Sequence, residues 1–175
     1  SNQNRWNKFR NTFIKLEVSL FEPRIPQNTG NIARSCAAFN IPLNLIEPLG
    51  FKLEDKYLKR AGLDYWPLVK INKYKNFERF LESKYSRRII SFSKKNGTYL
   101  KDFKFQKDDV LLFGREDSGL PESIIDKSDV LISIFMPNLQ TAEFEKKGVR
   151  SLNLSVACGI AIYEAHKQIN SQNSN

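Results

Sequence analysis

The sequence predicts one α/β domain with an open, mostly parallel sheet flanked by helices, and two observations carry this prediction. Segments patterned as strands alternate with segments patterned as helices along the chain. The run from Val110 to Phe113 is continuously apolar and stops at Gly114, which is typical of a parallel strand buried on both faces. At 175 residues, the chain has the length of one ordinary domain.

The first half of the chain begins with a predicted strand at residues 16–20, where apolar and polar residues alternate with a period of two. Apolar residues then recur at helical spacing from Ile32 to Phe39, and Asn28 or Thr29 is placed to cap this helix. Three further elements follow: a strand at 43–46, a helix that carries Phe77, Phe80, Leu81 and Lys84, and a strand at 88–93.

The second half repeats this alternation. After the buried strand, Pro121 and Glu122 suit the first turn of a helix. A strand is expected at 131–135, and a last helix from about Leu152 to Lys167. We therefore expect three regions: an N-terminal extension at 1–12, a single domain at 13–168, and a polar tail at 169–175 that frays.

The chain is basic, with 28 Lys and Arg against 19 acidic residues, a net charge of +9 and a pI near 9.6. Such an excess favours a polyanionic partner such as nucleic acid, although a basic balance also serves solubility. No stretch approaches the roughly 20 consecutive apolar residues of a membrane span. The first residues also lack the apolar core of a secretory signal, so we expect a cytoplasmic protein without a membrane partner.

Residue types limit the chemistry further. Cys36 and Cys158 are too few and too far apart for a metal knuckle or a disulfide framework, and buried thiols are expected. His166 is the single histidine, so a cluster of several histidines around a metal ion is excluded. We expect no metal, and chemistry that depends on an organic cofactor.

Three Gly- and Asn-rich segments fall at the carboxyl ends of predicted strands: PQNTGN, GREDSGLP and the loop into SLNLS. Ligands of open α/β sheets bind at these ends, so the three loops are expected to converge on one pocket. Each loop alone is also explained as a capped or tight turn. The chain has no phosphate-binding lysine loop and no GxGxxG motif, which disfavours nucleoside triphosphates and dinucleotides.

In this order and at these positions, the segments resemble the signature motifs of the SPOUT (α/β-knot) RNA methyltransferases. They read EPRIPQNTGNIARSCAAFN, LLFGREDSGLP and VRSLNLSVACGIAIYEA, and they look most like the small TrmL-type tRNA 2′-O-methyltransferases. The resemblance covers about residues 16–168. It implies methylation of a ribose 2′-hydroxyl at the wobble nucleotide (cytidine or uridine) of the tRNA anticodon stem-loop, with S-adenosyl-L-methionine as the methyl donor.

The resemblance also implies a fold that the pattern alone does not predict, a C-terminal trefoil knot built by residues 92–163. The family's cofactor contacts correspond by position to Phe92, Gly114, Glu116, Ile134, Ser151 and Leu152. A side chain at Gly114 would keep the cofactor from the backbone, and Glu116 either faces the cofactor or braces its loop.

A homodimer with the first and last helices across its two-fold axis is implied as well. The small residues of the last helix would permit close packing there: Ala157, Cys158, Gly159 and Ala161. The alternative is that this face lies against the helix's own sheet.

Arg34 matches the arginine that the 2′-O branch of the family uses at its catalytic centre. Because arginine is a poor base, we expect it to grip a substrate phosphate and fix the ribose, with direct proton abstraction as the alternative. Asn31 and Asn153 match motif asparagines, which orient the hydroxyl or serve as turns and caps. Tyr163 matches a tyrosine near the substrate, with a core position as the alternative, and His166 is expected to have no role.

Lys56, Lys59 and Arg60 form a basic cluster interleaved with aromatic residues such as Tyr57. This composition suits phosphate contacts combined with base stacking on unpaired RNA, and a solvated helix face is the alternative. Arg150, just before the third motif, is a further expected RNA contact. Two other functions stay open: ribose methylation of ribosomal RNA, and a catalytically silent RNA-binding knot protein.

Overall fold

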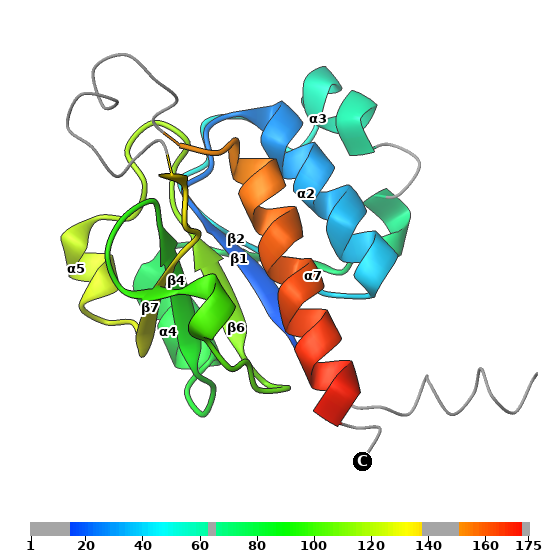
Figure 1. The fold of residues 1–175 in the computed structure, drawn as a ribbon. Helices are drawn as coiled ribbons and strands as arrows, with labels where there is room; N and C mark the ends of the chain where they lie inside the picture. Colours follow the sequence, from blue (N-terminus) through cyan, green and yellow to red (C-terminus); the bar gives the residue numbers. More distant parts are fainter. Residues whose placement is uncertain (1–14, 63–65, 138–150, 173–175) are drawn as a thin grey trace, which may run out of the picture.

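The computed structural model describes residues 15–62, 66–137 and 151–172, and its centre is a parallel sheet (Figure 1). All strand pairs among these residues are parallel, and the strand order is β3-β2-β1-β6-β4-β7-β5. The strands are β1 (Glu17–Phe21), β2 (Leu43–Ile46), β3 (Ile71–Tyr74), β4 (Ile89–Ser93), β5 (Thr98–Tyr99), β6 (Val110–Phe113) and β7 (Val130–Ser133). The predicted α/β class with a parallel sheet is confirmed.

Helices cover both faces of this sheet (Figure 1). On one face lie α2 (Pro26–Phe39) and α7 (Leu154–Gln172), side by side, and on the other lie α4 (Phe77–Ser83) and α5 (Glu122–Ile125). The short helix α3 (Lys56–Gly62) packs on α2. Two 3-10 turns complete the described elements, η1 (Trp66–Leu68) and η2 (Leu100–Asp102).

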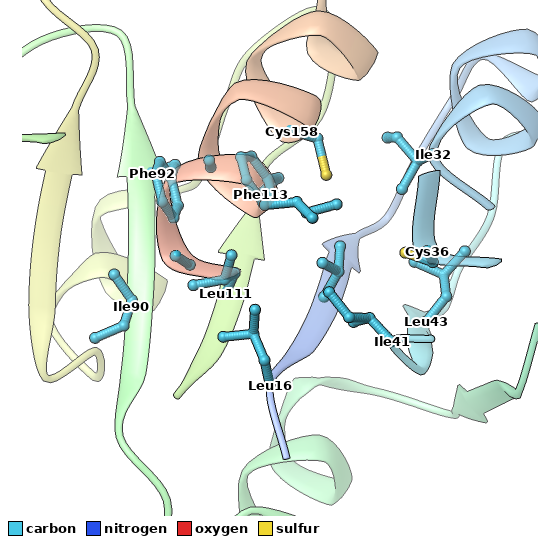
Figure 2. Packing of buried hydrophobic residues seen from close by; sticks show 14 of the residues in the cluster. Leu16, Ile32, Cys36, Ile41, Leu43, Ile90, Phe92, Leu111, Phe113 and Cys158 are labelled. Carbon is cyan, nitrogen blue, oxygen red and sulfur yellow. The ribbon is translucent and has the colours of Figure 1, made fainter. Parts of the chain in front are cut away.

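The central strands place apolar side chains on both faces and so belong to two cores. Leu111 and Phe113 of β6 pack in the core beneath α2 and α7, whereas Val110 and Leu112 pack against residues of α4 and α5. Figure 2 shows the first of these cores, in which Phe92 lies beside Phe113. Because both faces are covered, the strand reads as an unbroken apolar run.

The start of α2 differs from the prediction. Asn28 and Thr29 lie inside the helix, so their prediction as caps is wrong. The N-cap position is Ile25, which makes no side-chain cap bond, and Pro26 occupies the first turn. Proline is tolerated there because the first N–H groups of a helix have no intrahelical partner.

The C-terminal helix is longer than predicted. It ends at Gln172, so residues 169–172 of the expected polar tail are helical, and Ile169 is buried in the core beneath α2 and α7. Cys158 and Ala161 are fully buried in the same core, so these two small residues of α7 pack on the chain's own sheet, which was the alternative, whereas Ala157 and Gly159 are half-buried. Most other predicted elements lie within a residue or two of their expected bounds, whereas β3 and β5 were not predicted.

The trefoil knot stays a prediction. The connection between β7 and α7 that would form part of it includes residues 138–150, which lie outside the described residues, as does the expected extension at 1–12. Within the described part of the chain, no helix combines the length and the apolar character needed to cross a membrane.

Candidate active site

A cleft lies at the carboxyl ends of β4, β6 and β7, next to the first turns of α2 and α7. Its volume is about 580 Å³, within the range of roughly 300–1,000 Å³ that is typical of small-molecule sites. All three Gly- and Asn-rich segments line it: Asn28 from the first, residues 114–120 from the second, and residues 151–154 from the third. The predicted convergence of these loops is therefore confirmed.

Each of the six residues expected to contact a cofactor lines this cleft: Phe92, Gly114, Glu116, Ile134, Ser151 and Leu152. The ring of Phe92 stacks on that of Phe113, with centroids 4.5 Å apart and planes 12° apart. Both rings are buried, and the half-buried Ile134 and Leu152 extend the apolar part of the wall. An apolar wall with polar groups around it suits a ligand that contains a flat heterocycle.

Gly114 is required by the loop that follows it. Arg115 and Gly119 form an antiparallel bridge, which folds this loop back toward Gly114. A Cβ atom at Gly114 would lie 2.2 Å from the carbonyl carbon of Gly119 and 2.3 Å from the nitrogen of Leu120. The glycine therefore makes room for its own loop, and the reason expected from the sequence, room for the cofactor, stays a prediction.

Glu116 ties the second segment to the first. Its two carboxylate oxygens accept hydrogen bonds from the backbone N–H groups of Arg24, at 2.9 Å, and Ile25, at 3.0 Å. These N–H groups lie just before α2, where a negative charge also interacts favourably with the helix dipole. Glu116 lines the cleft and braces the loop at the same time.

Asn153 ties the third segment to the first. Its Oδ1 accepts hydrogen bonds from the N–H groups of Ser155, at 2.9 Å, and Val156, at 3.3 Å, which caps α7. Its Nδ2 donates to Oδ1 of Asn28 at 3.0 Å. Asn28 is only 7% exposed and was expected as a cap, not as a site residue. Its place in the PQNTGN segment was the signal that could have found it.

The rim of the cleft carries charged side chains. Arg115 donates two hydrogen bonds to the carboxylate of Asp117, at 2.9 and 2.7 Å, and these hold the pKa of Asp117 at about 2. Because both groups are near the surface, this pair contributes little stability. Lys94, at the end of β4, also lines the cleft, with its side chain exposed.

The residues expected at the catalytic centre are not all brought together. Asn31 and Arg34 are exposed on α2 and do not line the cleft. With a rise of about 1.5 Å and a turn of about 100° per residue, Arg34 lies roughly 9 Å along the helix from Asn28 and on a different face of α2. Tyr163 is 61% exposed on α7, so it is not a core tyrosine, and with Phe135 it lines a second hollow.

The residues expected to bind RNA are only partly described. Lys56, Lys59 and Arg60 are exposed on α3, which packs on α2. The ammonium group of Lys56 lies 5.1 Å from the centre of the Tyr57 ring. Arg150 lies outside the described residues.

The thiols and the imidazole are away from the cleft lining. Cys36 and Cys158 are free and buried, as expected; burial raises the pKa of Cys36 to about 12 and that of Cys158 well above its ordinary value. Such thiols stay protonated and inert. The ring of His166 packs edge-on against Phe39, with centroids 5.0 Å apart, and burial lowers its pKa.

Comparisons with known proteins agree with this geometry. The model of the SpoU rRNA Methylase family matches residues 15–163. The tRNA (cytidine(34)-2′-O)-methyltransferases of Aeromonas hydrophila and Escherichia coli K12 are 40% and 38% identical over 154 residues, which is 88% of this chain and 94% of each relative. A solved structure that concerns 2-OH methylation of C/U34 on tRNA is 44% identical, with a TM-score of 0.80, and the match covers 89% of this chain and 97% of the other. The chain therefore belongs to the SpoU rRNA methylase family.

Proposed function

We propose that this protein transfers a methyl group from S-adenosyl-L-methionine to the ribose 2′-hydroxyl of the wobble nucleotide in a tRNA anticodon. The observation that carries the proposal is the meeting of three distant segments in one cleft, beside the helix that bears Arg34. The relatives named for cytidine-34 methylation, at 38–40% identity over most of the chain, support the same substrate.

The cleft fits the proposed donor. The stacked Phe92 and Phe113, together with Ile134 and Leu152, offer an apolar wall for the adenine ring. Ser151 and the loop after Gly114 also line the cleft, and their backbone groups are the proposed hydrogen-bond partners of the donor. When bound, the donor supplies an activated methyl group, and methyl transfer then depends on alignment of the ribose oxygen with it, which can contribute roughly 7–11 kcal/mol.

Arg34 is the proposed substrate-gripping residue of the reaction. It is exposed on α2, the helix whose first turn borders the cleft. A guanidinium group binds phosphate through two hydrogen bonds but is a poor base. Arg34 therefore fixes the ribose through its phosphate as the new oxygen–carbon bond forms. The proton of the hydroxyl leaves to that phosphate or to water.

The two asparagines have different proposed roles. Asn153 acts through its bonds to Asn28 and to the start of α7, which hold the cleft walls in place, so it is a positioning residue. Asn31 is exposed one turn before Arg34 and is free to meet the ribose from the same face. On the neighbouring helix α3, Lys56, Lys59 and Arg60 are proposed contacts for the anticodon stem-loop.

A homodimer is part of the proposal. Val156, Ile160 and Tyr163 of α7 are 51%, 41% and 61% exposed, and their spacing places them on one face of the helix. Exposed apolar side chains grouped in this way are typical of an interface. This outward face, rather than the small residues buried beneath α7, is the one available to a second copy, and light scattering of the intact protein is expected to give the mass of a dimer.

The proposed function is tested by methyl transfer from a labelled donor to tRNA and to ribosomal RNA, with the methylated nucleotide mapped. We expect label at nucleotide 34 of tRNA. Arg34→Ala is expected to lower the transfer rate by about 10²-fold, because a ribose misplaced by about 1 Å loses alignment with the methyl group, with donor affinity nearly unchanged by calorimetry. Arg79→Ala, which removes an exposed arginine from α4, serves as the control.

Three outcomes would contradict the proposal in different ways. Label on ribosomal RNA alone would replace the substrate and keep the reaction. Absence of donor binding would indicate a catalytically silent RNA-binding protein. Full activity of Arg34→Ala would remove this arginine from the mechanism.

A further inference from the structure

Lys94 lines the cleft but is not among the residues proposed to hold the cofactor or to act in the reaction. It follows β4 by one residue and lines the cleft together with Ser93. Its side chain is exposed, so it lies at the lip of the cleft and not on its buried wall. Among the residues that the structure describes, Lys94 forms no ion pair.

The other charged groups lining the cleft already have partners. Arg115 and Asp117 pair with each other, and the carboxylate of Glu116 accepts two backbone hydrogen bonds. Within the described lining, Lys94 is therefore the charged side chain that no ion pair or hydrogen bond holds in place, although its charge and that of Glu116 are formally equal and opposite. An exposed ammonium group that is not engaged by the protein can pair with an anionic group of a ligand at the mouth of the cleft.

The donor is a poor candidate for this anion. S-adenosyl-L-methionine carries a sulfonium and an ammonium group against one carboxylate, so it is a cation overall and gains little from a further positive charge. RNA brings one negative charge with every nucleotide, and its target ribose must enter this cleft. The charge balance therefore favours a backbone phosphate over the donor's carboxylate.

The fold places Lys94 across the cleft from α2. The cleft is lined on one side by Ile25 and Asn28, at the start of α2, and on the other by residues at the ends of β4 and β7. In the sheet, β6 separates β1, which leads into α2, from β4, which leads to Lys94. A strand of RNA whose ribose points into the cleft would thus have Arg34 and the basic residues of α3 on one side and Lys94 on the other.

We propose that Lys94 binds a backbone phosphate next to the target nucleotide and holds the RNA at the lip of the cleft opposite α2. This inference rests on the proposed function, because it takes RNA as the substrate. It adds a second point of contact, so that the target ribose is held from both sides and not only through α2.

The test compares Lys94→Ala with the wild-type protein in binding an anticodon stem-loop RNA at several salt concentrations. Loss of one phosphate contact is expected to weaken RNA binding about three- to tenfold and to reduce the salt slope by about 0.7. Donor affinity, measured by calorimetry, is expected to stay the same. In methyl transfer, KM for RNA is expected to rise with little change in kcat, and Lys94→Arg is expected to restore it.

Lys107→Ala is the matched control, since it removes the same charge from an exposed position just before β6, at the amino ends of the strands and away from the cleft at their carboxyl ends. Equal weakening in Lys107→Ala would show a general effect of net charge and overturn the inference. A loss of donor affinity in Lys94→Ala, with an unchanged salt slope, would assign Lys94 to the donor's carboxylate and overturn it as well. Unchanged RNA binding by an active Lys94→Ala variant would contradict this inference alone. A wild-type protein that methylates none of the RNAs would contradict the proposed function.

Discussion

Two regions of the molecule place polar side chains close to the parallel sheet. In one region these side chains are buried and bond to one another, and in the other they line the cleft. Beneath α4, Glu17 of β1 is surrounded: its carboxylate meets the ammonium group of Lys84 at 3.0 Å, the guanidinium group of Arg87, and the amide of Asn44 at 3.4 Å. At the carboxyl ends of the strands, the polar groups line the cleft and bridge separate loops.

The difference teaches how one sheet combines stability with a binding site. The Glu17 network is closed, because its charged groups are satisfied by one another and the side chains of Glu17 and Lys84 are 7% and 9% exposed. In the cleft, Glu116 and Asn153 satisfy backbone and amide groups of neighbouring segments and leave the hollow between them open. The closed network is expected to contribute mainly to the stability of the fold. The open network is expected to contribute mainly to ligand binding.

The largest effect is expected from breaking the closed network. Glu17→Ala leaves Lys84 buried without its partner, and removal of one member of a buried ion pair typically costs about 3–5 kcal/mol. We expect a loss of this size in the free energy of unfolding, measured by urea denaturation. Donor affinity of the folded protein at low temperature is expected to be unchanged.

Arg79→Ala is the control for this prediction, because it removes an exposed ion pair with Glu82 on the neighbouring helix α4. Its cost is expected to stay below about 1 kcal/mol. Asn72→Ala provides a milder change to the same network, at the bond between Asn72 and Asn44. Equal stability of Glu17→Ala and Arg79→Ala would show that the two polar regions do not differ as argued.

An intermediate effect is expected from disturbing the open region. Gly114→Ala places a Cβ atom 2.2 Å from the backbone of Gly119, so the loop after β6 must move. A displacement of this loop by about 1 Å is expected to lower the rate of methyl transfer by about 100-fold and to weaken donor binding, as measured by calorimetry. Gly159→Ala is the matched control, since a Cβ atom at Gly159 meets no atom within 4 Å and donor affinity should persist. Normal donor binding by Gly114→Ala would place the donor elsewhere.

The same comparison explains which features could be predicted from the sequence. Buried apolar runs such as Val110 to Phe113 indicate parallel strands, and the three loop segments indicated one cleft, because parallel strands present their carboxyl ends at a common edge. The period of two in β1 predicted its strand but not the burial of Glu17 and Ser19, which are 5% and 0% exposed. That burial depends on α4 covering the second face of the sheet, a long-range contact that no local pattern encodes.

Local sequence patterns also could not predict the hydrogen bonds that join distant segments. Glu116 accepts its hydrogen bonds from residues 91 and 92 positions away, and Asn153 meets Asn28 across 125 positions. The resemblance placed both residues in the site, and the structure shows what their side chains hold. Residue roles in the reaction, and the knot, stay predictions.

The smallest effect is expected at His166, which lies outside both polar regions. Burial lowers its pKa, so the unfolded chain binds this proton more readily than the folded protein. Stability should therefore be fully present above the ordinary pKa of about 6.5 and fall as pH decreases from there toward the lower folded value. In His166→Gln, the urea midpoint of unfolding should depend less on pH over this range. The pH profile of methyl transfer should stay unchanged, because this imidazole does not line the cleft. A shifted rate profile in that variant would bring the histidine into the mechanism and weaken the role assigned to Arg34.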